Sequence, residues 1–239
     1  MTTNRATDTQ AYLAGDDTSF DALYPAEIRR ASRKYWTPVG VARRASELLR
    51  DAGARHVLDV GSGVGKFLLV AAITAPELRW VGIEQRAHLV AHAEEAKHIL
   101  SITNARFIVG DATDASWGEY DAFYFYNSFA ENLFDVNDYL DERAELSLQR
   151  YALHATRASV ALGAAPVGTA VATYHGSSGR IPCSYELAHV ESAGTGWLRL
   201  WHKKYQTDDG SFFSEVGGSV VRYDANGRIR GGTRNSRRA

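Results

Sequence analysis

Residues 57–67 read V-L-D-V-G-S-G-V-G-K-F, and this stretch decides how the rest of the chain is interpreted. A short β-branched, apolar run leads into a turn with glycines at positions 61, 63 and 65, and apolar residues of helical length follow. Glycine is needed where the backbone takes a positive φ or a ligand lies against it. Amides that open a helix carry partial positive charge. The stretch therefore predicts a strand, a glycine turn and a helix start that together cradle a nucleotide or cofactor.

The spacing within this cradle limits the kind of ligand. The dinucleotide fingerprint G-x-G-x-x-G, counted from Gly61, would need a third glycine where Lys66 stands. A phosphate-binding P-loop is excluded because Gly65-Lys66 is followed by Phe67 and not by Ser or Thr. Asp59 beside the turn would repel phosphates and suits a ligand with a cationic amino group. D-V-G-S-G-V-G resembles motif I of the class I S-adenosylmethionine-dependent methyltransferases.

Strands and helices alternate after the cradle. Strands are expected at 57–60, 79–84, 106–111, 120–126 and 167–174, and helices at 67–74, 86–100 and 139–162. Two further runs, 185–190 and 197–202, flank a Gly-rich turn and predict an antiparallel hairpin. This alternation predicts an α/β fold with a doubly wound, mostly parallel sheet. Seven strands with a final antiparallel pair are the usual ending in the family that the chain resembles.

Acidic residues close three of the predicted strands, namely Asp59, Glu84 and Asp111. Ligands of doubly wound sheets bind beyond the carboxyl ends of the strands. The resemblance implies that Glu84 accepts hydrogen bonds from the ribose hydroxyls and that Asp111 holds the adenine amine. The alternative is that these acids only cap helices. The complete set of predicted cofactor-binding residues is Thr37, Asp59, Gly61, Ser62, Gly63, Gly65, Glu84, Gln85, Asp111, Ala112, Asn127 and Phe129.

The end of the fourth strand, F-Y-N-S-F-A at 125–130, is where the resemblance places the reactive methyl group. N-S-F-A is similar to N-N-F-A of the disruptor-of-telomeric-silencing family, histone lysine methyltransferases without a SET domain. Ser128 departs from that pattern, and nothing resembles the family's chromatin-binding extensions. The resemblance does not imply a histone substrate. It covers about a third of the chain.

The catalytic residues predicted from this stretch are Asn127, Tyr126 and Glu131, with His175 as a further candidate base. Asn127 would orient the lone pair of an amine, which favours methylation of nitrogen. S-adenosylmethionine would be the methyl donor and S-adenosylhomocysteine the product. A dedicated base is needed only if the nucleophile carries a proton.

Residues 20–53 are expected to form two helices that meet at Trp36-Thr37-Pro38, with Thr37 as N-cap of the second helix. The resemblance places Thr37 near the carboxylate of the cofactor. Seven basic residues lie in the same segment. A solvated helix face is one interpretation, and a surface for an acidic substrate or nucleic acid is the other.

The chain divides into three predicted parts. Residues 1–53 form a mobile arm and a helical segment, 54–205 the methyltransferase domain, and 206–239 a small hairpin and a basic tail. The turn D-A-N-G at 224–227 supports the hairpin. We expect residues 1–19 and 230–239 to lack stable structure.

Composition narrows the partners. The chain has 239 residues, a net charge of −1 and one cysteine, so neither a disulfide framework nor a multi-cysteine zinc site is predicted. We predict no metal site, a cytoplasmic location and a small-molecule or protein substrate, and we expect neither nucleic acid nor a membrane as partner. The oligomeric state stays open. Two alternatives to a methyltransferase remain, a nicotinamide-dependent oxidoreductase and a non-catalytic cofactor-binding module.

Overall fold

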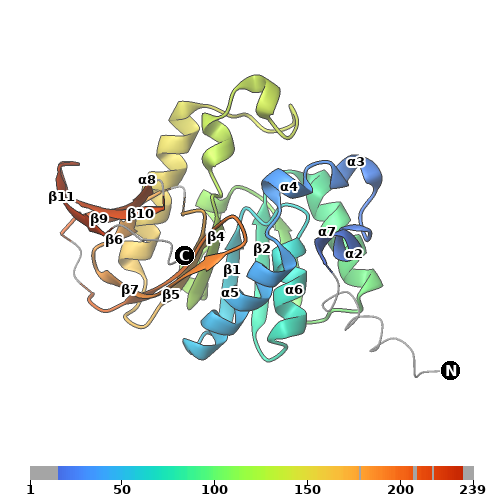
Figure 1. Ribbon diagram of the computed structural model, residues 1–239, viewed down its shortest axis with the longest axis horizontal. Coiled ribbons are helices and arrows are strands. Elements are labelled where there is room, and N and C mark those ends of the chain that lie inside the picture. Colours follow the sequence, from blue (N-terminus) through green and yellow to red (C-terminus); the bar gives the residue numbers. More distant parts are fainter. Residues whose placement is uncertain (1–15, 178, 207–208, 217, 234–239) are drawn as a thin grey trace.

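The computed structural model describes residues 16–177, 179–206, 209–216 and 218–233, which form a seven-stranded sheet covered by helices and a smaller sheet beside it (Figure 1). The strands of the large sheet are β1 His56–Val60, β2 Arg79–Glu84, β3 Ala105–Val109, β4 Ala122–Tyr126, β5 Ala170–Tyr174, β7 Tyr185–Ala193 and β8 Gly196–Lys203. Their order across the sheet is β3-β2-β1-β4-β5-β8-β7. The first five run parallel, whereas β8 runs antiparallel to both of its neighbours. The predicted sheet and its final hairpin are therefore present.

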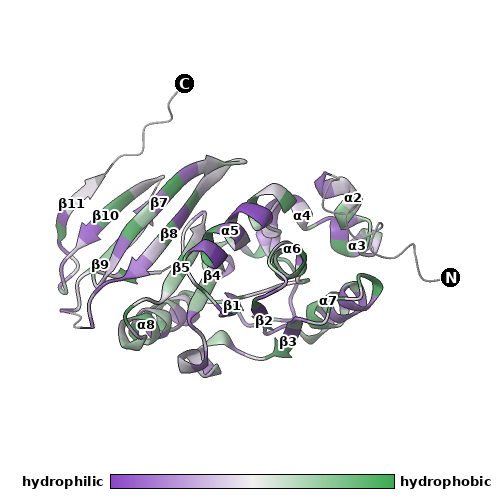
Figure 2. Cartoon of the chain, turned by 90° about the horizontal axis from the view of Figure 1, so that it is seen from below, coloured by the Kyte–Doolittle hydropathy of each residue, from purple (hydrophilic) through white to green (hydrophobic). Residues whose placement is uncertain are grey.

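Helices cover both faces of this sheet (Figure 2). The longer helices are α5 Val39–Asp51, α6 Lys66–Thr74, α7 Ala87–Ile99 and α8 Leu148–Ala164. Neighbouring strand residues such as Val57 and Leu58 belong to different buried clusters, because side chains alternate between the faces of a strand. One cluster packs under α5, α6 and α7, and the other packs under α8. No helix in the described part of the chain is long and apolar enough to cross a membrane.

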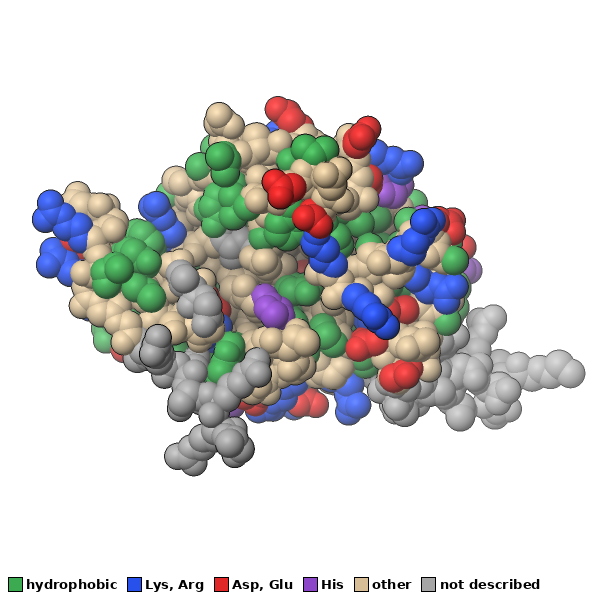
Figure 3. All heavy atoms as spheres, turned by 45° about the horizontal axis from the view of Figure 1, so that its top comes forward, with side chains coloured by type: hydrophobic (Ala, Val, Ile, Leu, Met, Phe, Trp, Pro, Cys, Tyr) green, Lys and Arg blue, Asp and Glu red, His purple; other side chains and the backbone are tan. Residues whose placement is uncertain are grey.

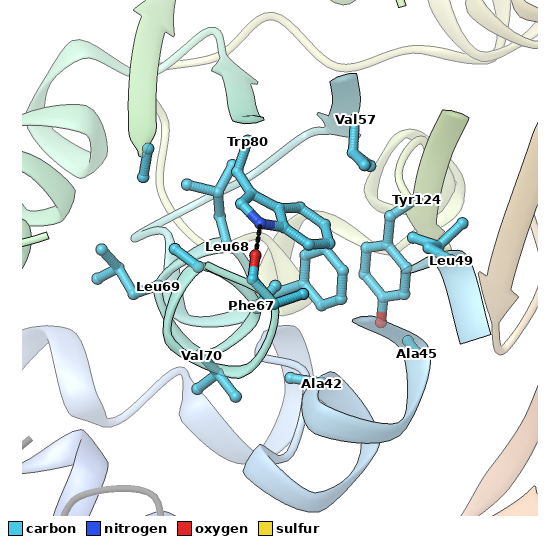
Figure 4. Packing of buried hydrophobic residues seen from close by; sticks show 14 of the residues in the cluster. Ala42, Ala45, Leu49, Val57, Phe67, Leu68, Leu69, Val70, Trp80 and Tyr124 are labelled. Atoms are coloured by element: carbon cyan, nitrogen blue, oxygen red, sulfur yellow. Dashed lines mark hydrogen bonds between the residues drawn. The ribbon is translucent and has the colours of Figure 1, made fainter. Parts of the chain in front are cut away.

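The helix that follows the glycine turn is fixed by aromatic packing (Figure 4). Phe67 of α6 stacks on Tyr124 of β4, with ring centroids 3.5 Å apart and an interplanar angle of 7°. Trp80 of β2 meets Phe67 edge-on and donates its indole N–H to the Ala75 carbonyl at 3.2 Å. Buried aromatic side chains contribute large apolar areas to a core. These contacts hold the start of α6, and with it the glycine turn, at the sheet edge.

The N-terminal segment differs from its prediction. It contains α2 Asp17–Asp21, α3 Ala26–Arg29 and α4 Ser32–Tyr35 before α5, in place of one helix. Pro38 precedes α5 without a side-chain cap, because the Thr37 hydroxyl is 2.9 Å from the Tyr124 hydroxyl instead. Residues 16–19, expected to be mobile, include the N-cap of α2, whereas 1–15 lie outside the described residues.

The segment before α8 is also not the predicted helix. Helix α8 starts after Ser147, whose hydroxyl accepts the Arg150 N–H at 3.2 Å, and residues 139–147 form turns and irregular backbone. The short 3₁₀ helices η1 Ala112–Asp114, η2 Trp117–Glu119, η3 Ala130–Leu133 and η4 Val136–Asp138 fill the connections around β4. Ser147 is a strong helix-starting residue that competes with any continuation of the helix toward the N-terminus.

A second sheet, absent from the predictions apart from one hairpin, packs beside α8 (Figure 1). Its order is β11-β10-β9-β6, with β6 Ile181–Pro182, β9 Phe212–Val216, β10 Ser219–Tyr223 and β11 Ile229–Thr233. Residues 181–182, for which no strand was predicted, pair with β9 in this sheet. Part of the supposedly disordered tail is strand β11, and residues 234–239 lie outside the described part.

Candidate active site

A cavity of about 430 Å³ opens where β1, β2 and β4 end, on the face turned forward in Figure 3. Eleven of the predicted site residues line it: Gly61, Gly63, Glu84, Gln85, Asp111, Ala112, Tyr126, Asn127, Phe129, Glu131 and His175. Four do not, namely Thr37, Asp59, Ser62 and Gly65. The cavity also takes wall residues from α4 and α8, which places helices of the N-terminal and C-terminal halves around one opening.

The three glycines of the turn have positive φ angles of 77°, 55° and 79° at Gly61, Gly63 and Gly65. Their surroundings differ. A Cβ at Gly63 would meet no atom within 4 Å, so the backbone there faces open space. A Cβ at Gly65 would lie 2.4 Å from the Phe107 ring. Gly63 therefore leaves room for a ligand, whereas Gly65 permits close packing of the turn on the sheet.

Glu84 turns its carboxylate toward this glycine turn. Its Oε2 accepts the Gly63 N–H at 3.1 Å and its Oε1 accepts the Arg86 N–H at 2.9 Å. Burial raises the pKa of Glu84 above its usual value, although the hydrogen bond from Arg86 opposes that rise. A carboxylate held in this way at a cavity wall can accept hydrogen bonds from a pair of hydroxyl groups.

Asp59 lies behind the turn with only 3% of its surface exposed. Its Oδ2 has no hydrogen-bond partner among the described residues, and the same holds for the hydroxyls of Ser62 and Ser128. Burial and the nearby charge of Glu84 raise the pKa of Asp59 well above its usual range. A buried acceptor without a donor costs free energy. Such a group is expected where a ligand supplies the missing donor.

Asp111 is already saturated by protein donors. Oδ1 accepts the backbone and hydroxyl groups of Thr113 at 2.8 and 2.7 Å, and Oδ2 accepts Arg150 Nη2 and lies 3.0 Å from His154 Nε2. Burial alone would raise the pKa of Asp111, but the bonds from Thr113 and His154 outweigh it and the pKa is lowered. A carboxylate offers about four lone-pair sites. Asp111 therefore fixes helix α8 against the cavity.

Two residues with strained backbones lie side by side at the other end of the cavity. Tyr126 of β4 pairs with Tyr174 of β5, and the residues that follow them, Asn127 and His175, both line the cavity. Asn127 has φ 47° and His175 has φ 56°, values that non-glycine residues seldom adopt. The Asn127 N–H donates to the Gly176 carbonyl at 3.0 Å. Strain of this kind concentrates at functional sites.

The candidate bases differ in their availability. Burial, followed by the effect of Tyr174, raises the pKa of Tyr126 to about 12. Glu131 Oε1 accepts Arg86 Nη2 at 2.9 Å and the Leu140 N–H at 2.7 Å, so its carboxylate is engaged in the wall. Burial lowers the pKa of His175, which keeps its ring neutral near pH 7. His175 is the most accessible proton acceptor of the three.

Several contacts that shape the site are not predictable from local sequence patterns. The ammonium of Lys66, 3% exposed, lies 2.7 Å from Asp17 and 2.5 Å from Asp21. The Tyr24 hydroxyl donates to the Val64 carbonyl at 3.0 Å. These contacts hold helix α2 and Tyr24, which follows it, against the glycine turn. The only available signal was the substitution of Lys66 for the third glycine of a dinucleotide motif.

Comparisons with known proteins agree with this geometry. Residues 52–143 match a family model described as a methyltransferase domain. A 23S rRNA (uracil(1939)-C(5))-methyltransferase, RlmD, of Nitrosococcus oceani is 35% identical over 96 residues, which are 40% of this chain and 21% of that protein. A tRNA (guanine-N(7)-)-methyltransferase of Microcystis aeruginosa is 41% identical over 84 residues, 35% of this chain and 39% of that protein. The chain thus matches between a fifth and two fifths of the length of these relatives.

Solved structures share the fold. An RNA methyltransferase from Salinibacter ruber, in complex with S-adenosyl-L-homocysteine, matches with TM-score 0.52 and 20% identity over 72% of this chain and 96% of that chain. A methyltransferase from Geobacter sulfurreducens matches with TM-score 0.50 and 16% identity over 82% and 97%. The prediction of a class I methyltransferase fold is confirmed, and residues 52–143 match the predicted methyltransferase domain. The S-adenosyl-L-homocysteine in the Salinibacter ruber structure agrees with the prediction of S-adenosylmethionine as cofactor. The narrower resemblance to the disruptor-of-telomeric-silencing branch is not confirmed.

The expectation about partners is contradicted. We expected a small-molecule or protein substrate and no nucleic acid, whereas the curated relatives described above are named as RNA methyltransferases. The expectation rested on a net charge of −1, and an average over the chain carries no information about local patches.

Proposed function

We propose that this chain, with its methyltransferase domain at residues 52–143, transfers a methyl group from S-adenosylmethionine to a nitrogen of RNA. The observation that carries the proposal is the meeting of the glycine turn, Glu84 and Asn127 around one cavity at the carboxyl ends of the parallel strands. The names of the curated relatives support RNA as the substrate class.

The residues present fit the cofactor. Gly63 leaves open space in the turn, Glu84 offers a carboxylate to the ribose hydroxyls, and the Oδ2 of Asp59 lacks a donor among the described residues. Gln85 and Ala112 line the cavity beside the ends of β2 and β3, where they would border the adenine ring. When bound, S-adenosylmethionine supplies a methyl group activated by its sulfonium.

Asn127 and its neighbours would position the substrate. Asn127, Phe129 and Ala130 carry the narrower resemblance noted in the sequence, and all three line the cavity. The Asn127 amide orients the nucleophilic nitrogen, and Phe129 excludes water. Positioning of two reactants alone can contribute about 7–11 kcal/mol to lowering a barrier.

The chemistry of the wall favours nitrogen over carbon. A uracil carbon becomes nucleophilic only after another nucleophile has added to the ring, and a thiolate is well suited to that step. Cys183, the single cysteine, does not line the cavity. A base nitrogen has its own lone pair and needs only orientation.

Two measurements test the proposal. Calorimetric titration with S-adenosylhomocysteine and, separately, NADH should give micromolar binding of the former alone. The protein is then incubated with tritiated S-adenosylmethionine and with tRNA and 23S rRNA transcribed in vitro, which carry no modifications. The RNA is digested, and the methylated nucleoside is identified by chromatography and mass spectrometry. We expect an N-methylated nucleoside, and Glu84→Ala should abolish it. Binding of NADH alone, or label on a base carbon alone, would overturn the proposal.

A further inference from the structure

Three arginines on the first helices carry charge that no described carboxylate neutralises. Arg29, Arg30 and Arg33 are exposed, and none forms an ion pair within the part of the chain that the structure describes. In the next helix, Arg44 pairs with Glu191 at 2.9 Å and Arg50 pairs with Asp51 at 2.9 Å, whereas the exposed Arg43 forms no ion pair with a described residue. We call Arg29, Arg30 and Arg33 the arginine ridge.

The ridge leads to the cavity. Arg33 lines the cavity together with Lys34, Tyr35 and Trp36 of the same short segment, and α3 precedes it directly along the chain (Figure 1). Lys34 pairs with Asp138 at 3.0 Å across the opening. The uncompensated positive charge therefore begins on the surface at α3 and ends at the cavity wall.

A second segment at the opening, residues 131–145, is rich in acidic residues. Segment 131–145 contains six acidic residues, Glu131, Asp135, Asp138, Asp141, Glu142 and Glu145, and a single arginine, Arg143. In Figure 3, acidic and basic side chains are both present on this face. Four of these acids, Glu131, Asp138, Asp141 and Glu145, pair with basic residues, so their charges are largely compensated. The unpaired positive charge of the ridge therefore favours approach of a polyanion from the α3–α4 side.

An aromatic platform lies at the point where this path meets the cavity. Phe134 lines the cavity, its ring centroid is 6.3 Å from that of Tyr35, and Lys34 Nζ is 4.5 Å from the Phe134 centroid. Grooves that bind single-stranded nucleic acid combine positive charge along the backbone with aromatic rings on which bases stack. The opening of this cavity has both features.

We propose that the arginine ridge binds the phosphate backbone of a single-stranded RNA segment while one base stacks on Phe134 and a neighbouring base enters the cavity. This inference rests on the proposed function, because it requires RNA as the substrate. It adds the direction of approach and the conformation of the RNA. A paired base would first have to be flipped out of its duplex, which costs free energy that a single strand does not require.

The test is fluorescence anisotropy with a labelled 12-nucleotide single-stranded RNA of mixed sequence at KCl concentrations from 50 to 300 mM. The ridge variant Arg29→Gln/Arg30→Gln/Arg33→Gln is compared with Arg79→Gln/Arg106→Gln/Arg228→Gln, which removes three exposed arginines that also lack ion pairs with described residues and lie away from the opening. Removal of one arginine–phosphate interaction lowers the salt slope by about 0.7 for a single strand. We expect the slope to fall by about 2 and affinity to drop at least tenfold in the ridge variant only.

A second variant separates stacking from charge. Phe134→Leu should weaken binding about tenfold while leaving the salt slope unchanged, because a stacked base contributes without releasing counterions. Calorimetry with S-adenosylhomocysteine and thermal unfolding check that each variant is folded. A ridge variant with the slope of the parent would overturn this inference and leave the proposed function standing. Failure of the parent to bind RNA while it binds S-adenosylhomocysteine would overturn RNA as substrate and the inference with it.

Discussion

Asp59 and Glu215 are two acids buried in different regions of the molecule, and they are treated in opposite ways. Glu215 of the second sheet pairs with Arg199 of β8 and accepts the Thr173 hydroxyl at 2.6 Å, so that it joins the two sheets. Asp59 behind the glycine turn has an Oδ2 without a partner among the described residues. The carboxylate at the sheet junction is paired within the protein, whereas the one behind the turn keeps an oxygen that a ligand could satisfy.

The largest expected effect is at the junction. Glu215→Ala leaves the guanidinium of Arg199, 1% exposed, without its carboxylate. Removal of one partner of a buried ion pair typically costs about 3–5 kcal/mol. We expect a reduction of that size in the free energy of unfolding measured in urea, with the affinity for S-adenosylhomocysteine retained.

The double variant Glu215→Leu/Arg199→Met provides the control. It removes both charges, so most of the free energy of unfolding that Glu215→Ala loses should be recovered. A double variant no more stable than the single one would show that the pair contributes through packing and not through charge.

The middle effect is at the turn. Asp59→Asn should raise the free energy of unfolding of the ligand-free protein and weaken S-adenosylhomocysteine binding about tenfold or more, because a hydrogen bond to a charged group is removed.

The pH dependence of the free energy of unfolding has a definite sign. The folded pKa of Asp59 lies above its unfolded value of about 3.9, so the native state binds more protons between these two values. Unfolding free energy therefore falls as pH rises through that window.

Urea titrations of parent and Asp59→Asn from pH 3.5 upward measure this dependence. The variant should show a flatter profile than the parent. If the free energy of unfolding depended on pH identically in both proteins, ionising Asp59 would cost the folded protein nothing. Asp59 and Glu215 would then not differ in the way described.

The smallest effect separates two glycines of the same turn. Gly63→Ala should cost about 1–2 kcal/mol, the penalty of a left-handed backbone for alanine, because the added Cβ meets no atom. Gly65→Ala should cost more, since its Cβ would lie 2.4 Å from Phe107. Thermal unfolding ranks the two, and calorimetry should show that Gly63→Ala weakens S-adenosylhomocysteine binding as well. The reverse ranking would contradict the assignment of open space to Gly63.

The parts of the site that were predictable are local in sequence. Strands β1 to β4 follow apolar runs of four to seven residues, and parallel strands bring their carboxyl ends to one edge, so Glu84 and Asn127 were placed beside one cavity without coordinates. The spacing of the glycines also predicted the turn. Short-range patterns were sufficient in each case.

The parts that were missed depend on distant residues. Two of the four donors that saturate Asp111 come from Arg150 and His154, about forty positions away, and no periodicity links them. Lys66 reaches Asp17 and Asp21 across more than forty residues. The second sheet pairs Ile181 with Phe213. Composition and charge, averaged over the chain, gave a wrong expectation about nucleic acid for the same reason.

The insertion of β8 between β5 and β7 has a consequence for synthesis on the ribosome. Everything that surrounds the glycine turn on the β1–β4 side, from Asp17 to Tyr126, emerges first and can fold as a unit. Strand β5 emerges later and stays an open edge until residues 196–203 leave the exit tunnel. Open edges invite pairing with other chains. We expect chaperones to act most strongly on nascent chains from which β5, but not yet residues 196–203, has left the exit tunnel.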